Sequence, residues 1–375
     1  MAIQSIQLTL LIGPTLPIPA PRFVMEALQG VEVTTSAGSR SGFQLTFSLS
    51  NRSPLHTVFL IAANASPLAL RVILVATMNG TPNVLADGII TRQEIAPAQA
   101  GMSTLTITGE DLTTVMDRQE FNGIPYPAMP PEARVALIIA KYAMFGIIPL
   151  VIPSLFTDLP IPTDRIPSHE GTDLAYINRL AADVGHTFYI DPGPLPGMNT
   201  AYWGPQIKIG IPQPALNTDM DAFTNVESLT FNVKHNEKAM PIVFIQEPTT
   251  KVSIPIPIPD LNPLQPPLGI AVPFPTKFML MKDTAKLSPM AAIGKGIAAA
   301  AESSDFVEGS GSLNVLRYGR LLKARQLVGV RGAGLAFDGL YYVKSVTSSL
   351  RQGEFKQRFS LTRNALVSIT PVVPA

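Results

Sequence analysis

The chain of 375 residues contains no cysteine. Disulfide bonds, thiolate zinc sites and cysteine nucleophiles are therefore excluded by composition alone. Charged residues are also scarce: they form 15% of the chain, against roughly 25% in ordinary soluble domains. Apolar residues form 46%, and the mean hydropathy is +0.25. Two explanations compete, a membrane protein or a subunit that buries much of its surface in an assembly.

Long hydrophobic runs are missing as well. No stretch approaches the ~20 apolar residues of a membrane-spanning helix, because the longest candidate, residues 135–148, is interrupted by Lys141 and Gly146. The N-terminal apolar run has no basic residues before it, so we expect neither a signal peptide nor a membrane span. Large permanent interfaces, which are more apolar than ordinary surface, explain the composition better.

A strong charge of either sign is absent too. The net charge is +1, from 28 basic and 27 acidic residues, and no basic stripe occurs. We therefore expect no specific nucleic-acid binding. Synthesis in the cytoplasm fits the lack of cysteine and of a signal peptide.

The first third of the chain has the pattern of an all-β region. Residues 43–49 alternate apolar and polar side chains with a period of two, and further strands are predicted at 5–11, 56–63, 70–78, 84–91 and 103–108. Strands at such short intervals predict a barrel or a sandwich.

Helical patterns follow. Asp111 opens a short helix, Pro131 begins a helix that reaches Phe145, and Thr172 caps a helix that Gly185 ends. A strand is predicted over 186–191. This alternation indicates a small α/β insertion over roughly 126–210.

A second β region begins near residue 221 and is interrupted. Residues 247–275 hold nine of the 36 prolines, which predicts an extended loop, a polyproline-like segment or a sheet edge. Ser288 and Pro289 begin an alanine-rich helix that reaches about Ala301, and 303–312 has the composition of a mobile linker. The last strands, over 314–366, complete this region.

No sequence motif for catalysis, a cofactor or a metal is present. The four histidines (His56, His169, His186 and His235) lack metal-ligand spacing, and we expect them at the surface or in turns. Nucleophile-elbow, Walker and dinucleotide patterns are missing, and the glycine-rich VRGAG at 330–334 is typical of a β-turn.

Two groups of residues leave an enzyme or a binding module open as alternatives. Glu110 with Asp111, or Asp117 with Glu120, could form a glycosidase pair, but their helical spacing is more typical of a solvated face. Trp203 could bind a sugar or peptide, although packing at a strand edge is the simpler expectation.

Three segments, in order along the chain, carry a resemblance to a known family. They read TLTITGEDLTTVMDRQE over 104–120, EGTDLAYINRLAADVGHTFYID over 170–191, and NVLRYGRLLKARQLVGVRGAGLAFDGLYYVKSVTSSLRQGEFKQRFSLTRNAL over 314–366. The set resembles the baseplate hub proteins of contractile phage tails and injection systems, the late control protein D group, and is similar to the hub part of type VI secretion spike proteins. The proline-rich run and the alanine-rich helix have no counterpart in it.

The resemblance implies a mainly β (α+β) fold with two tube-protein-like antiparallel β-barrels and a small inserted α/β domain. We expect the first barrel over 1–125, the α/β domain over 126–215, the second barrel over 216–246 and 312–366, the proline-rich loop and alanine-rich helix as an insertion over 247–311, and a tail over 367–375.

The same resemblance implies a structural function without catalysis, cofactor or metal. The expected protein is a homotrimer that presents six similar barrels. Such a ring would adapt a hexameric inner tube to a trimeric spike, with baseplate wedge proteins as further partners in a phage tail-like particle. The alternatives are a tail-associated cell-wall hydrolase and a carbohydrate- or membrane-docking module that uses the Ile-Pro run.

The positions that carry the family signature come from these three segments. They are Gly109, Asp111, Leu112, Asp117, Leu180, Gly185, Tyr318, Gly332, Asp338, Gly339, Tyr341, Val346, Phe359 and Arg363.

Overall fold

The computed structural model of the protein describes residues 6–369, except for 50–52, 56–58, 60–69, 98–102, 155–161, 164–165, 235–237, 247–251, 261, 283 and 285–287. Within these described residues, no helix has the length and apolar character needed to cross a membrane. The strand expected over 56–63 lies, apart from Phe59, outside them. So do His56 and His235.

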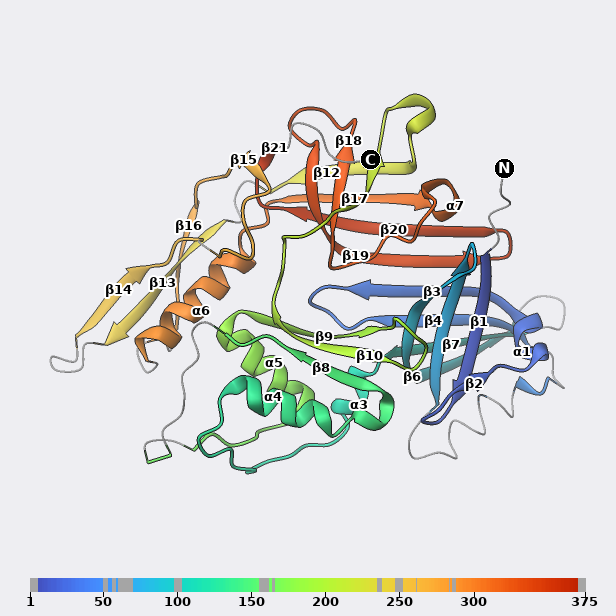
Figure 1. Ribbon diagram of the computed structural model, residues 1–375, viewed down its shortest axis with the longest axis horizontal. Coiled ribbons are helices and arrows are strands. Elements are labelled where there is room, and N and C mark those ends of the chain that lie inside the picture. The colour runs from blue at the N-terminus through green and yellow to red at the C-terminus, as the bar shows by residue number, and fades with distance from the viewer. Residues whose placement is uncertain are drawn as a thin grey trace.

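The N-terminal third forms one half of a large sheet (Figure 1). Its strands pair in the order β3-β4-β7-β6-β5-β1, with the short β2 beside β1 and the helix α1 before β3. Alternating burial along β4, with Phe43, Leu45 and Phe47 inside, is what the period of two predicts. The bounds are β1 (Ile6–Gly13), β2 (Ile18–Pro19), α1 (Arg22–Ala27), β3 (Leu28–Ser36), β4 (Gly42–Leu49), β5 (Arg71–Met78), β6 (Thr81–Pro97) and β7 (Ser103–Asp111).

The C-terminal part forms the other half of the sheet. Its strands pair in the order β12-β17-β20-β19-β18-β11, and the helix α7 connects β17 to β18. The bounds are β11 (Gln213–Asn217), β12 (Val226–Val233), β17 (Val307–Asn314), α7 (Val315–Tyr318), β18 (Leu327–Arg331), β19 (Gly339–Arg351) and β20 (Glu354–Arg363).

The two halves repeat one strand order. Taken along the chain, β1, β3, β4, β5, β6 and β7 correspond to β11, β12, β17, β18, β19 and β20. Every pairing among these six strands of one half recurs in the other. The β3–β4 pair shifts register between Leu28 and Gly30, and the β12–β17 pair shifts between Val226 and Ser228. The β6–β7 and β19–β20 pairs share a second such shift. One difference is that β1–β5 is antiparallel whereas β11–β18 is parallel.

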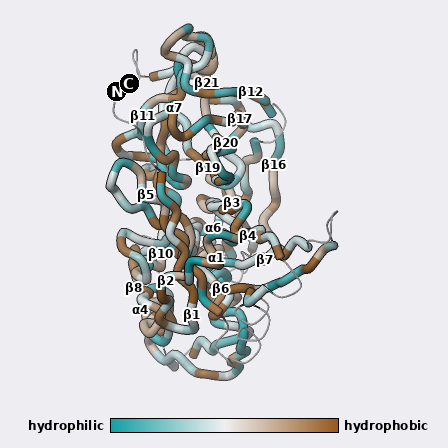
Figure 2. The backbone as a smooth tube through the Cα atoms, turned by 90° about the vertical axis from the view of Figure 1, so that its right-hand side faces the viewer, coloured by the Kyte–Doolittle hydropathy of each residue, from teal (hydrophilic) through white to brown (hydrophobic). Residues whose placement is uncertain are grey.

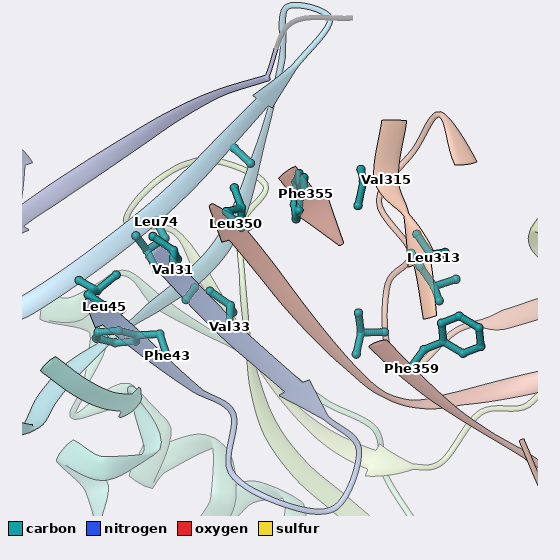
Figure 3. Packing of buried hydrophobic residues seen from close by; sticks show 14 of the residues in the cluster. Val31, Val33, Phe43, Leu45, Leu74, Leu313, Val315, Leu350, Phe355 and Phe359 are labelled. Atoms are coloured by element: carbon teal, nitrogen blue, oxygen red, sulfur yellow. The ribbon is translucent and has the colours of Figure 1, made fainter. Parts of the chain in front are cut away.

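The halves are joined edge to edge, because β3 also pairs with β19 over seven residue pairs, from Ser36–Ser345 to Gly30–Arg351. The result is one 13-stranded sheet in place of two separate ones. One hydrophobic core runs across the joint, and Figure 3 shows Val31 and Val33 of β3 in the same cluster as Leu350 and Phe359. The prediction of a mainly β fold is confirmed, and the structure adds that the two β regions share a sheet.

The α/β insertion follows β7 and lies below the first half in Figure 1. A sheet of order β8-β10-β9 packs against helices α4 and α5. The Thr172 hydroxyl accepts a hydrogen bond from the Ala175 amide, and Gly185 ends α5 at φ 70°, as the sequence predicted. The bounds are α3 (Thr113–Met116), α4 (Pro131–Ala140), β8 (Ile147–Val151), α5 (Asp173–Val184), β9 (His186–Pro192) and β10 (Asn199–Pro205).

A second small sheet, of order β14-β13-β16, is inserted between β12 and β17, and the helix α6 packs on β13. The Ile-Pro run forms β14 at an edge, one of the three expected conformations. Ser288 caps α6 as predicted. The bounds are β13 (Ala239–Gln246), β14 (Ser253–Pro257), β15 (Gly269–Ala271), β16 (Lys277–Leu280), α6 (Pro289–Glu302) and β21 (Leu366–Ser368), and β15 pairs with β21.

The linker predicted over 303–312 is wrong, because most of it belongs to the central strand β17. Its glycines are needed for space and not for mobility. A Cβ on Gly309 would lie 3.2 Å from the Phe231 ring, and one on Gly311 would lie 2.7 Å from the Phe359 ring. Aromatic rings from the neighbouring strands thus occupy the space that side chains at 309 and 311 would need.

The contact between α5 and α6 gives a testable prediction. A Cβ added to Gly185 would lie 2.7 Å from the Ala298 Cβ, whereas one added to Gly171, which also has positive φ, would meet only Ala175 at 3.7 Å. We expect Gly171→Ala to lower the free energy of unfolding by about 1 kcal/mol through backbone strain, and Gly185→Ala by about 2–4 kcal/mol because overpacking adds to that strain. Denaturant unfolding of both variants measures the difference, and equal losses would contradict the close packing of the two helices.

Candidate functional site

The first group of signature residues lies where β7 ends and α3 begins. Asp111 is buried, and its carboxylate accepts hydrogen bonds from the Ser41 amide at 2.9 Å and the Thr113 amide at 3.0 Å. Burial raises the pKa of Asp111, although these hydrogen bonds oppose the rise. Gly109 is close-packed, since a Cβ there would lie 2.2 Å from the Phe43 ring. Both residues fix the turn from the sheet into the α/β insertion, and Leu112 beside them is fully buried.

Asp117 ties α5 to the same turn. Its carboxylate accepts a hydrogen bond from the Thr172 hydroxyl at 2.7 Å. It also forms an ion pair with Arg40, whose guanidinium binds Glu110 as well. Burial would raise the pKa of Asp117, but the hydrogen bonds from Thr172 and Arg40 outweigh it and hold this pKa below its usual range. Three of the four carboxylates considered above for a glycosidase pair, those of Glu110, Asp111 and Asp117, are thus engaged in structural contacts.

Arg325 forms a junction of three parts of the chain that the sequence analysis did not find. Its guanidinium donates to the Ser36 carbonyl oxygen at 2.6 Å, pairs with Asp191 of β9, and lies 3.9 Å from the centre of the Tyr189 ring. The side chain is only 4% exposed. One cation therefore holds the second half of the sheet to the first half and to the α/β insertion.

A second buried clamp joins the α/β insertion to the first half. Arg71 of β5 donates to both Asp87 carboxylate oxygens at 2.7 Å, and to the main-chain oxygen of Phe145 at 2.8 Å. Asn199 of β10 donates to the same Asp87 at 2.9 Å. The pair is almost fully buried. The sequence could have indicated it, because Arg71 and Asp87 are the single charged residues of the strands expected over 70–78 and 84–91.

The second group of signature residues converges at the end of β20. Arg363 is fully buried and donates to the main-chain oxygens of Asp338 at 3.0 Å and Leu268 at 2.9 Å, with the Tyr341 ring 5.1 Å away. Gly339 has φ 130°, and a Cβ there would lie 2.9 Å from the Arg363 guanidinium. This cluster fastens β15 and the turn before β19 onto the sheet.

The remaining signature residues lie elsewhere in the fold. Leu180 and Gly185 pack in the α/β insertion, and Val346 and Phe359 belong to the main core. The Tyr318 hydroxyl donates to the Pro214 carbonyl oxygen at 2.5 Å. Gly332 has φ 82° in a close turn against the main chain of Thr218. The signature positions thus form two clusters and scattered core contacts, not one reactive site.

The expectation of surface histidines is wrong for His169, which is fully buried and stacks on Tyr176 with ring centres 4.4 Å apart. Burial lowers the pKa of His169 and lowers the pKa of His186 to about 4. Trp203 is also fully buried, in the central strand β10 and not at a strand edge. Among the described residues, no group of three or more His, Asp or Glu is placed to hold a metal ion.

Large apolar side chains are exposed on β15, on β16 and on the segment between them. We call this set the apolar flank. Its members are Ile270, Phe274, Phe278 and Leu280, with exposed fractions of 62–89%. Apolar exposure of this kind is typical of a surface that another molecule covers.

The Arg71–Asp87 clamp predicts a large effect of removing one charge. Asp87→Ala leaves the Arg71 guanidinium buried without its carboxylate, and we expect a loss of about 3–5 kcal/mol in the free energy of unfolding. Glu26→Ala, which removes the partner of exposed Arg22, serves as the control and should cost under about 1 kcal/mol. Denaturant unfolding measures both, and similar losses would show that the clamp contributes little.

His186 predicts acid sensitivity of the fold. Its pKa is about 4 in the folded state against an ordinary value of 6.5, so the unfolded state binds the proton first. Stability should therefore be unaffected above pH 6.5 and should fall as the pH drops from 6.5 toward 4. His186→Asn cannot take up this proton and should lose less stability over that window. Unfolding midpoints of both proteins at pH 7 and pH 5 measure this, and parallel losses would contradict it.

No protein-family model matches the sequence, and no curated protein matches it either. Solved structures do match, over nearly the whole chain. A tail protein from Neisseria meningitidis MC58 has a TM-score of 0.61 at 11% identity, covering 96% of this chain and 98% of its own. The 43 kDa tail protein of prophage MuSo2 from Shewanella oneidensis has a TM-score of 0.60 at 13% identity, covering 96% and 100%.

A component of the type VI secretion system of Escherichia coli, itself similar in structure to tail proteins of bacteriophage T4, has a TM-score of 0.53 at 11% identity. The match covers 93% of this chain and 76% of that one. At such low identity the matches establish the fold alone. The resemblance seen in the sequence is thus confirmed at the level of the fold, which this chain shares with phage tail proteins and a type VI secretion component.

Proposed function

We propose that the protein is the structural hub of the baseplate of a contractile tail or injection system. In this proposal three copies assemble about one axis, and each contributes two similar half-sheets, so that the trimer presents six. One side of such a ring suits a hexameric inner tube and the other a trimeric spike. Wedge proteins of the baseplate are further partners, and the chain acts without catalysis or cofactor.

The observation that carries the proposal is the repeated strand order. Six strands pair as β3-β4-β7-β6-β5-β1 in one half and as β12-β17-β20-β19-β18-β11 in the other, with register shifts at corresponding places. A chain that contains one pattern twice can occupy two of six quasi-equivalent positions. The tail-protein names of two structural neighbours support the same conclusion.

The composition supports assembly as well. With 15% charged residues and an apolar flank that includes Phe274 at 89% exposure, the isolated chain shows surface that permanent interfaces would cover. The segment from β15 to β16 that bears the flank is the candidate contact for the spike or a wedge protein. It is an insertion in the second half only, so it appears three times in a trimer and not six.

The cell-wall hydrolase alternative gains no support from the residues that suggested it. Trp203 is fully buried, and Asp111 and Asp117 are held by main-chain amides, Thr172 and Arg40. No second function is therefore proposed.

Native mass spectrometry of the purified protein tests the proposal. We expect a complex of three 40.2 kDa chains, which co-purifies with the tube and spike proteins of its own particle when they are produced together. Phe274→Ser together with Phe278→Ser should weaken capture of spike or wedge protein while leaving the trimer intact. A stable monomer that captures neither tube nor spike protein would contradict the proposal.

A further inference from the structure

The joint between β3 and β19 shows how one half-sheet binds another. After a register shift between Val343 and Ser345, β19 leaves β18 and pairs antiparallel with β3 from Ser345 to Arg351. β3 is the outermost strand of its half, and β19 lies inside the other half. The joint therefore combines the edge strand β3 with the part of β19 that extends beyond its neighbour β18.

The same two kinds of edge occur a second time, and no other described strand pairs with them. β12 is the counterpart of β3, and within the described residues it pairs only with β17. β6 is the counterpart of β19. It pairs with β5 up to Ile89, and the Ile90 amide still donates to the Leu70 carbonyl oxygen. After a register shift between Ile90 and Arg92, its pairing among the described strands is with β7 alone. In Figure 2 an arm beside the labels β4 and β7 projects from the body of the molecule. In β6, Arg92 and residues 94–97 are exposed.

We propose that β12 of one copy of this chain pairs antiparallel with residues 92–96 of β6 in a neighbouring copy and so repeats the β3–β19 joint between subunits. The inference rests on the homotrimer proposed above and identifies the strand edges that form it. Each chain carries one edge of each kind. The contact is thus heterologous, and such contacts close into a ring when the rotation allows it.

The shared register shifts fix the expected pairing. Leu28 and Gly30 correspond to Val226 and Ser228, and Val343 and Ser345 correspond to Ile90 and Arg92. When these correspondences are applied to the β3–β19 register, each residue of β12 acquires a defined partner. The expected pairs are Arg92–Lys234, Gln93–Val233, Glu94–Asn232, Ile95–Phe231 and Ala96–Thr230.

The side chains fit this register. Ile95, 45% exposed in the isolated chain, would face Phe231, whose ring stacks on Phe337 at the core side of the sheet. Arg92 and Lys234 would be neighbours, but each already has a carboxylate, Glu94 at 2.9 Å and Glu308 at 3.0 Å.

The counterparts on β19 show what the joint does to such positions. Val346 and Ser348, which correspond to Gln93 and Ile95, are buried next to β3. The Gln93 side chain donates to the carbonyl oxygen of Phe59, a member of the main core, at 2.9 Å.

Cysteine cross-linking tests the joint on a background without native cysteine. Opposite residues in antiparallel strands have Cα atoms about 4.5–5.5 Å apart, which suits a disulfide bond. We expect the full chain with Ala96→Cys and Thr230→Cys to form covalent dimers and closed trimers under mild oxidation, seen on a non-reducing gel. Glu32→Cys with Ser349→Cys, the corresponding pair of the internal joint, should form a disulfide within one chain.

Ile95→Cys with Thr230→Cys is the register control, since these side chains would point to opposite faces. It should cross-link at least tenfold less than the matched pair. A trimer in native mass spectrometry whose matched pair cross-links no more than this control would overturn the joint and leave the homotrimer standing. A monomer in native mass spectrometry would remove the homotrimer and the joint together.

Discussion

Main-chain pairing between β3 and β19 is the interaction on which the rest of the structure depends. Without it the two half-sheets would each end in an open edge and expose the apolar residues that now share one core, such as Val33 and Leu350. An open sheet edge readily pairs with another strand, because its amide and carbonyl groups lack hydrogen-bond partners. The chain uses this property to join its own halves, and it fixes their register through shifts on both sides of the contact.

Buried arginines then fix how the inserted parts sit on the sheet. Arg325, Arg71 and Arg363 each bind main-chain oxygens. Arg325 also pairs with Asp191 of the α/β insertion, and Arg71 pairs with Asp87 of the neighbouring strand β6. Charge buried in this way contributes little net stability, since desolvation offsets the attraction, but a misplaced contact is heavily penalised. In a protein with so few charges, we infer that these buried arginines fix the orientation of the inserted parts more than they add to the free energy of unfolding. The ring proposed above would need that fixed orientation.

Local features of the fold were predictable, and contacts between distant segments were not. The caps Thr172 and Ser288, the stop at Gly185 and the alternation along β4 are encoded within a few residues, so the sequence predicted them. β17 was missed because its strand conformation depends on the rings of Phe231 and Phe359 from other strands. Arg325 was missed for the same kind of reason, since its partner Ser36 lies 289 positions away. The duplicated strand order is likewise invisible without the pairings, because the two halves share topology and very little sequence.

The distribution of proline indicates which sheet edges resist pairing with another strand. The edge strands β14 and β8 carry Pro255, Pro257 and Pro149, and β11 carries Pro214, while β16 is only four residues long. Proline cannot donate to a ladder, and short edges pair weakly, so these edges resist strand addition. β12 is eight residues long and contains no proline, although the chain holds 36. An unprotected edge of that length is an aggregation hazard for an isolated protein, so its retention is best explained by a partner strand that occupies it.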